Sequence, residues 1–202
     1  IMHGLNISPD LDTVTYTVAD AIDPERGWGL ANESWRVMES LARYQDVKPD
    51  SSTAAGTWFN LGDRDLATHF YRTARIAEGA TLSTVTQEIA RAWGLAFTMM
   101  PMSDDQVATK VDIFENGVAS TISFQEYFVR LRHAAAVAGL QFDGATTATP
   151  NGLHTLADAD IVVIAPSNPL VSIGPVRAVP GVNATLAPRR NSVVAISPII
   201  GG

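Results

Sequence analysis

Residues 160–175 read DIVVIAPSNPLVSIGP, a short polar start, an unbroken apolar run, and then a loop rich in proline and serine. A second apolar run, Val193–Ile196, also leads into a Ser-Pro loop. Continuous apolar runs of this length are typical of parallel strands that are covered on both faces. The two runs therefore predict an α/β fold with a Rossmann-like, doubly wound and mostly parallel sheet.

Four helices are expected upstream of these runs. Apolar spacing predicts one helix over 11–22 and a second over 33–44, with Asn32 as the cap of the second. A third helix is expected from Gly62 to just before Gly79, with Asp65 as its N-cap. A fourth is indicated by a capping-box spacing of Thr84 and Gln87.

The remaining segments predict loops, an inner strand and a hairpin. The stretch 48–57 is rich in Pro, Ser, Thr, Ala and Gly and indicates a surface loop, whereas 95–100 is apolar enough for an inner strand. An Asn-Gly turn at 116–117 predicts a β-hairpin excursion formed by 107–114 and 118–124. The alanine-rich stretch 134–150 is compatible with a connecting helix.

Composition narrows the class of protein. A chain of 202 residues with 46% hydrophobic and 17% charged residues is long enough for one sizeable core, so we expect a single α/β domain over 1–202, truncated at both ends. No apolar run approaches the roughly 18 residues of a membrane helix. The net charge of −7 argues against a nucleic-acid partner, and the lack of cysteine fits a cytoplasmic protein.

Asp10 and Asp12 are candidates for a magnesium site at the start of the first expected helix. Paired carboxylates suit a hard cation that also bridges to substrate phosphates. An aspartate at a helix start also serves as a cap, so the spacing alone leaves both interpretations open.

Two other polar loops could bind a substrate. In Gly62–Asp65, a fixed arginine stands between two aspartates and could hold a phosphate, although a capped helix with a surface ion pair has the same pattern. The loop 166–175 is rigid and polar and could turn its amides toward a ligand or form a structural turn. Ser103–Asp105 is a further polar loop that could join them, and the histidines show no zinc-ligand spacing.

Six stretches, taken in order, resemble the 2-phospho-L-lactate transferase family of coenzyme F(420) biosynthesis. The resemblance covers nearly the whole chain, and its motifs are specific in combination. The stretches are Ser8–Thr13, Arg26–Gly29, Leu61–His69, Pro101–Asp105, Ala165–Pro175 and Ser197–Gly201.

This resemblance implies an activity that composition does not. Members join the deazaflavin alcohol FO to a phospholactyl or phosphoenolpyruvyl group held as a guanosine diphosphate conjugate, release GMP and require Mg²⁺. It also implies a homodimer. The family's Gly-rich nucleotide loop would precede the first residue, so the 202-residue chain alone is expected to be inactive.

Site residues carried over by motif match fall into two groups. Asp12, Asp63 and Arg64 are expected to be catalytic. Asp12 would contact the metal or FO, and Asp63 and Arg64 would lie at the FO and phosphate end of the substrates. The substrate-binding positions are Asp12, Asn60, Asp65, His69, Ser167, Asn168 and Gly174. Asn60 stands where many relatives carry a basic residue that contacts FO, and the sequence leaves phospholactate, phosphoenolpyruvate and phosphoglycerate open as donors.

A rival interpretation is a non-catalytic regulator that binds a nucleotide sugar, of the gluconeogenesis-factor-like type that shares this fold ancestry. The intact Ser8–Asp12 and Gly62–Asp65 motifs favour the enzyme.

Overall fold

The computed structural model describes residues 2–115, 117–132 and 134–198. The chain divides into two compact units, Ile1–Pro101 and Met102–Gly202. Helices and strands occur together, with parallel and antiparallel pairing, so the expected α/β class is confirmed. The single-domain expectation stays a prediction. Among the described residues, no helix is both long enough and apolar enough to cross a membrane.

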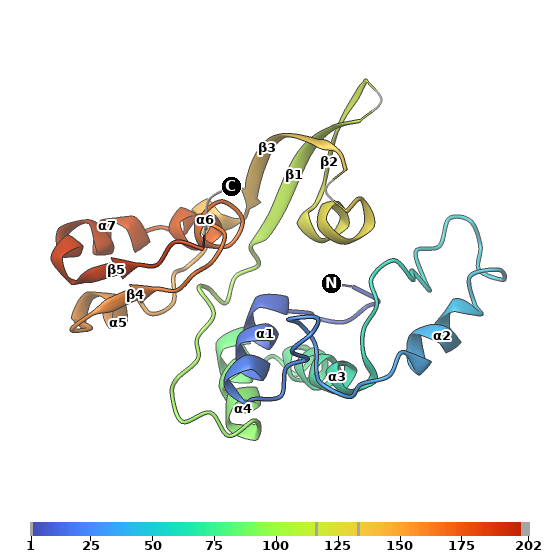
Figure 1. The fold of residues 1–202 in the computed structure, drawn as a ribbon, viewed down its shortest axis with the longest axis horizontal. Helices are drawn as coiled ribbons and strands as arrows, with labels where there is room; N and C mark the ends of the chain where they lie inside the picture. Colours follow the sequence, from blue (N-terminus) through green and yellow to red (C-terminus); the bar gives the residue numbers. More distant parts are fainter. Residues whose placement is uncertain (1, 116, 133, 199–202) are drawn as a thin grey trace. The chain divides into compact units, whose positions relative to one another are not determined.

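The first unit is helical (Figure 1). It contains α1 (Pro9–Val18), α2 (Arg36–Ala42), α3 (Asp63–Ala77) and α4 (Leu82–Ala92). Its core includes Met38, Leu61 and Leu66, which share one buried cluster. Leu66 is in α3 and Met38 in α2, so this cluster holds the segment before α3 against both helices.

Four expectations for the first unit need correction. Helix α1 ends at Val18, four residues early, because the chain turns at Asp20, whose φ is 53°. Helix α2 begins at Arg36, because Asn32 has a φ of 59° and cannot start a right-handed helix. The N-cap of α4 is Thr81, whose side chain accepts from the Thr84 backbone NH, so Thr84 lies inside the helix.

The fourth correction concerns 95–100, which is irregular and forms no strand. Met99 is buried, but Phe97 is 48% exposed and Met100 40% exposed. An apolar run becomes a strand only where a neighbouring strand satisfies its backbone, and this segment has no ladder partner among the described residues. Helix α3 matches its expected bounds closely, and 48–57 is a loop as expected.

The second unit contains two sheets. One is antiparallel, with the order β2-β1-β3, and consists of β1 (Ala108–Glu115), β2 (Val118–Ser123) and β3 (Ala136–Asp143). The expected hairpin is confirmed, with Glu115 paired to Val118 and Gly117 at a φ of 81°, whereas Asn116 lies outside the described residues. The long ribbon made by β1 and β3 is evident in Figure 1. The stretch 136–143, thought compatible with a helix, is therefore a strand.

The other sheet is parallel. Strand β4 (Val162–Ile164) pairs with β5 (Val193–Ala195), which confirms the parallel pairing of the two apolar runs. Six short helical segments complete the described part of the unit: π-helical Glu126–Arg130, 3₁₀ Ala145–Thr147 and Ala187–Ser192, α5 (Leu153–Asp158), α6 (Ile173–Ala178) and α7 (Val182–Leu186). Burial on both faces is not observed, since Val163 is 59% exposed and Val194 52% exposed.

Candidate functional site

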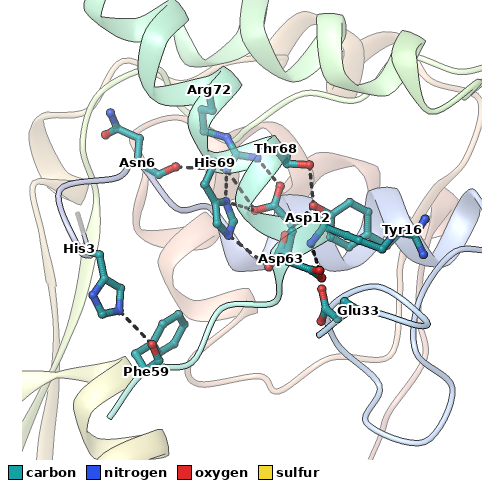
Figure 2. A network of polar contacts seen from close by, with 12 residues as sticks. His3, Asn6, Asp12, Tyr16, Glu33, Phe59, Asp63, Thr68, His69 and Arg72 are labelled. Carbon is teal, nitrogen blue, oxygen red and sulfur yellow. Dashed lines mark hydrogen bonds and ion pairs between the residues drawn. The ribbon is translucent and has the colours of Figure 1, made fainter. Parts of the chain in front are cut away.

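Helices α1 and α3 face each other through polar side chains (Figure 2). Helix α1 presents Asp12 and Tyr16, which are four residues apart and therefore on one face. Helix α3 presents Asp65, His69 and Arg72, at spacings of four and three. Polar groups at these positions are buried rather than solvated, so each requires a partner across the helix pair.

Asp12 and Arg72 form the centre of this group. Their side chains are 6% and 1% exposed. Arg72 Nη1 donates to Asp12 Oδ2 at 3.1 Å, and Nη2 donates to the other oxygen, Oδ1. Nη1 also donates to the Asn6 carbonyl at 3.3 Å. The bidentate pairing compensates the desolvation of both charges, which would otherwise be strongly unfavourable.

His69 lies between the two carboxylates. Its Nδ1 is 3.7 Å from Asp12 Oδ2, and its Nε2 is 3.2 Å from Asp65 Oδ2. Nε2 is buried and has no hydrogen bond of good geometry, despite this short distance to Asp65. The imidazole ring therefore lies close to both carboxylates, and its Nε2 makes no hydrogen bond of good geometry.

Tyr16 completes the network from α1. Its hydroxyl lies 2.6 Å from Asp65 Oδ1 and 2.8 Å from Thr68 Oγ1. A phenol has a single proton, and an ionised carboxylate can only accept, so Tyr16 donates to Asp65 and accepts from Thr68. Burial, together with the charges of Asp65 and Asp12, raises the pKa of Tyr16 well above its ordinary value. The hydroxyl therefore stays protonated and serves as a donor.

The two carboxylates have pKa values shifted in opposite directions. Burial raises the pKa of Asp12, and the charge and hydrogen bonds of Arg72 counter only part of that effect. Burial also acts to raise the pKa of Asp65, but His69 and the Tyr16 hydroxyl outweigh it, so the pKa of Asp65 is lowered. Strongly perturbed neighbouring acids are more common at functional sites than elsewhere.

A small cavity opens beside this network. Its volume is about 60 Å³. Since a water molecule occupies roughly 30 Å³ in the liquid, the cavity accommodates an ion or one to two waters, far less than the roughly 300–1,000 Å³ of a typical ligand pocket. It is lined by Ile7, Pro9, Asp12, Thr13, Tyr16, Trp28, Gly29, Phe59, Asn60, Leu61, Asp65 and His69.

Asp12, Asp65 and His69 could together hold a metal ion, because one ligand atom from each lies within 4.8 Å of the others. Two carboxylates supply the oxygen donors that Mg²⁺ prefers, and the unused His69 Nε2 is a further donor. The donor set therefore fits a divalent cation. Both Asp12 oxygens are held by Arg72, so an ion must share or displace that contact.

A second, partly buried ion pair lies next to Trp28, which lines the cavity. Arg26 Nη2 donates to Glu33 Oε1 at 2.9 Å, and the Glu33 side chain is fully buried. The Arg26 guanidinium also lies 5.0 Å from the ring centres of both Trp28 and Trp35. Cation–π contacts on both rings and the carboxylate together fix the guanidinium. Trp28, itself 47% exposed, is thereby held at the edge of the cavity.

A comparison with known protein families identifies the family of this chain. The sequence model of a family described as 2-phospho-L-lactate transferase CofD matches residues 2–202. The chain belongs to the CofD family.

Curated relatives of this CofD-family chain are named phosphoenolpyruvate transferase. That of Mycolicibacterium smegmatis is 43% identical over 205 residues, which cover 100% of this chain and 60% of the relative. That of Mycobacterium avium is 43% identical over 208 residues, covering 100% and 58%. The Mycobacterium tuberculosis protein is 43% identical over 204 residues, covering 99% and 59%. The chain thus spans about three fifths of the length of these relatives.

Two solved structures from Bacillus halodurans are similar to this chain. A crystal structure of a UPF0052 family protein is 15% identical with a TM-score of 0.47, covering 60% of this chain and 38% of that one. A second is 14% identical with a TM-score of 0.48, covering 92% and 55%.

Within this CofD-family chain, the structure separates Asp10 from Asp12. Asp10 is exposed and does not belong to the metal-competent group. Residues two apart on a helix do not face the same side, so the pair cannot act as one chelate on α1. The candidate ligands next to Asp12 are Asp65 and His69 of α3, and not Asp10 as the Asp-x-Asp pattern predicted.

The predicted residues on the first turn of α3 have other contacts. Asp63 is exposed, accepts from the Ser34 backbone NH at 2.7 Å and from the Ser34 hydroxyl at 2.9 Å, and its pKa is lowered chiefly by these bonds. Arg64 donates to the Ala31 carbonyl. Both side chains therefore fasten the 31–34 segment to α3, and neither lines the cavity. Asp65 is not the N-cap, which is Gly62. A catalytic role of Asp63 and Arg64 stays a prediction.

Ser167, Asn168 and Gly174 belong to the second unit. Asn168 Oδ1 accepts from the backbone NH groups of Leu170 at 2.9 Å and Val171 at 3.2 Å, so its side chain organises its own turn. Ser167 is partly buried in the same loop, and Gly174 lies in α6. The Ser103 hydroxyl donates to the Thr149 carbonyl at 2.6 Å, which ties that loop into the unit. Ligand binding by these residues stays a prediction.

Sequence reasoning missed Tyr16 and Arg72. The signal was available in the spacing of α3, where Asp65, His69 and Arg72 fall at i, i+4 and i+7 and therefore share one face. Titratable side chains that recur on one face of a helix in this way indicate a polar network on that face. Tyr16, four residues after Asp12, repeats the pattern on α1.

Proposed function

We propose that this chain forms the metal-binding part of a transferase that joins a phosphoenolpyruvyl or phospholactyl group to the deazaflavin FO, in coenzyme F(420) biosynthesis. Membership of the CofD family supports the reaction class. The name phosphoenolpyruvate transferase, carried by relatives that are 43% identical along the whole chain, favours phosphoenolpyruvate as the transferred group.

One observation supports this function most directly. The buried carboxylate of Asp12 and the partly buried carboxylate of Asp65 converge with His69 beside a small cavity, and their pKa values are shifted in opposite directions. Transfer of a group between phosphate oxygens requires neutralisation of a growing negative charge, and a held divalent ion is the usual means.

The reaction forms one bond and breaks one. A ribityl hydroxyl oxygen of FO attacks the phosphorus distal to guanosine, the hydroxyl proton is lost, and the phosphoanhydride bond to GMP breaks. Asp12, Asp65 and His69 would hold a divalent ion, which would supply charge neutralisation at the phosphates. Tyr16 keeps the Asp65 carboxylate oriented by donating to it. Trp28, Asn60 and Phe59 border the same cavity and offer contact surface to the acceptor.

The cavity is too small to enclose either substrate, so most of each substrate is bound by surface outside it. The polar loop around Ser167 and Asn168 is our candidate for contacts to the nucleotide end. In this proposal, residues of α1 and α3 bind the metal and FO, and residues outside these two helices contact the guanosine diphosphate.

The test uses the full-length protein with FO, a guanosine diphosphate-linked phosphoenolpyruvate and Mg²⁺. Mass spectrometry of the FO product and chromatography of GMP measure turnover. We expect both products with the native protein and neither with Asp12→Asn, while Asp50→Asn, in an exposed loop, keeps normal turnover. No FO product from the native protein, together with tight binding of a uridine-linked sugar, would overturn the proposal in favour of the regulator.

A further inference from the structure

Arg72 takes no part in the proposed reaction, yet it is the most completely buried charged group of the site. It is among the largest side chains that are buried almost completely, at 1% exposed. Its neighbour on α3, Arg75, is partly exposed and pairs with Glu78 and Glu88 at the surface. Arg72, in contrast, extends into the group of metal-competent side chains (Figure 2).

The contacts of Arg72 are those of a cation bound to a carboxylate. Both terminal nitrogens donate to Asp12, one to each oxygen, so the guanidinium covers the whole carboxylate edge. Nη1 is also 3.3 Å from His69 Nδ1. Arg72 thus touches two of the three residues that could hold a metal ion, and it occupies oxygen atoms that the ion would use.

A divalent ion and this guanidinium cannot act independently. Both are cations, both are attracted to Asp12, and each disfavours the other at a separation of a few ångströms in a buried site. In the absence of an ion, Arg72 offsets the cost of burying the Asp12 charge. With an ion bound, that compensation comes from the metal.

We propose that Arg72 is a positioning residue that serves as the resident counter-cation of Asp12 and is displaced from at least one Asp12 oxygen when the metal binds. Arg72 therefore lowers the metal affinity of the site while it keeps Asp12 in place between α1 and α3. This inference rests on the metal site of the proposed function. By lowering the metal affinity, Arg72 allows the ion to be held reversibly.

The first experiment measures the affinity of the full-length protein for Mn²⁺ and for Mg²⁺ alone, by calorimetry at pH 8. Arg72→Gln removes the competing charge but keeps hydrogen-bond donors, so we expect at least about tenfold tighter metal binding. Arg72→Lys keeps the charge, and its affinity should stay within about threefold of the native value. Arg75→Gln, the matched control on the same helix, should not change the affinity.

Stability supplies a readout that is independent of turnover. Without metal, Arg72→Gln should have a lower melting temperature than the native protein, because Asp12 loses its counter-charge. Saturating Mg²⁺ should raise the melting temperature of this variant by more than that of the native protein, since the ion binds the variant more tightly. A residue that served only to maintain the fold would give the opposite result, with weaker metal binding in the damaged variant.

A measurement on the native protein covers the case in which Arg72→Gln does not fold. Nitrogen-15 spectra of the arginine side chains should show that the Nη resonances of Arg72 shift on addition of Mg²⁺, while those of Arg75 do not. Metal binding by the native protein with unchanged Arg72 resonances, or with no gain in affinity in Arg72→Gln, overturns the inference and leaves the proposed function standing. Absence of any metal binding by the native protein removes the metal site, and the inference with it, while turnover tests the transferase separately.

Discussion

Asp12 is the residue whose replacement should affect stability most. As a mere helix cap it would be worth about 1 kcal/mol. In the structure it neutralises a fully buried arginine, so Asp12→Ala leaves Arg72 without its counter-charge. Breaking a buried pair in this way costs about 3–5 kcal/mol. Urea unfolding followed by tryptophan fluorescence measures the loss, because all four tryptophans lie in the same unit as Asp12.

The matched control for that prediction is Asp10→Ala on the same helix. Asp10 is exposed in the first turn of α1, where a carboxylate interacts favourably with the helix dipole by no more than about 1 kcal/mol. Equal losses for the two variants would show that Asp12 acts as a cap, and that its contact with Arg72 adds nothing to stability.

Gly62 should not tolerate a side chain, for reasons of space rather than backbone conformation. Its φ of −69° is open to any residue, but a Cβ there would lie 1.9 Å from the Glu33 carboxyl. The Glu33 carboxylate cannot move away easily, because Arg26 donates a hydrogen bond to it and Gly29 also lies close to it. Gly62→Ala should therefore lower the free energy of unfolding by about 1–3 kcal/mol.

Gly56→Ala is the comparison for Gly62→Ala. The nearest atom to an added Cβ at Gly56 is 3.7 Å away, in the Trp58 ring, which is ordinary van der Waals contact. Thermal unfolding of both variants distinguishes crowding from a general intolerance of alanine in this segment. A melting temperature for Gly62→Ala equal to that of the native protein would mean that Glu33 moves aside freely.

At the scale of elements, the contact between α3 and α4 predicts an acid dependence of stability. Hydrogen bonds from Arg75, and then from Tyr71, lower the pKa of Glu88 to about 2 from its ordinary value of 4.5. A lowered pKa means that the unfolded chain takes up this proton first as the pH falls. The stabilisation is therefore complete above about pH 4.5 and is lost as the pH falls toward 2.

Glu88→Gln should remove that dependence. The variant is expected to be less stable than the native protein at pH 7, and its stability should fall less steeply between pH 4.5 and 2. Chemical unfolding at a series of pH values measures both effects. Glu78→Gln is the matched control. Glu78 is the other carboxylate beside Arg75 but lies at the end of α3 itself, so its loss should leave the packing of α3 on α4 intact. Identical acid profiles for native protein and Glu88→Gln would contradict this account.

Elements were predictable from sequence where one local signal was sufficient. Helix α3 has a start signal, regular apolar spacing and a glycine beyond its end, and its bounds agree with expectation. The hairpin followed from Asn-Gly. Residues 95–100 were wrongly assigned to a strand and 134–150 could not be assigned, because only a partner strand decides whether such a stretch becomes a strand. Strand β3 pairs with β1, which precedes it by more than 20 residues in the chain, whereas 95–100 has no such ladder.

The site followed the same rule at the scale of the molecule. Motif matches predicted Asp12 as a metal ligand and Asp65 and His69 as substrate-binding residues, and the structure brings these three side chains together. Arg72 and Tyr16 lie outside those patterns, and their roles depend on α1 facing α3, which no local spacing specifies. Asp10 was chosen by proximity in sequence, although proximity on a helix is set by turns of three to four residues.

The division into two units predicts that each has a stability of its own. The core of the first unit includes Met38, Leu61 and Leu66, and a core of the second includes Val111, Ile113 and Ala135, with no residue shared between these clusters. Cores that share no residues can open as separate cooperative units. Hydrogen exchange of backbone amides, read peptide by peptide with mass spectrometry, distinguishes one such unit from another.

Two reciprocal variants carry this test. Asp12→Asn should reduce amide protection in α1 and α3 and leave β1 and β3 unchanged, because the lost ion pair joins only the helices. Val111→Ala, which removes a side chain that is 1% exposed, should weaken β1 and β3 by about 2 kcal/mol and leave α1 and α3 protected. Loss of protection across both units in either variant would show that they unfold together, in which case the buried network of α1 and α3 also stabilises the sheets.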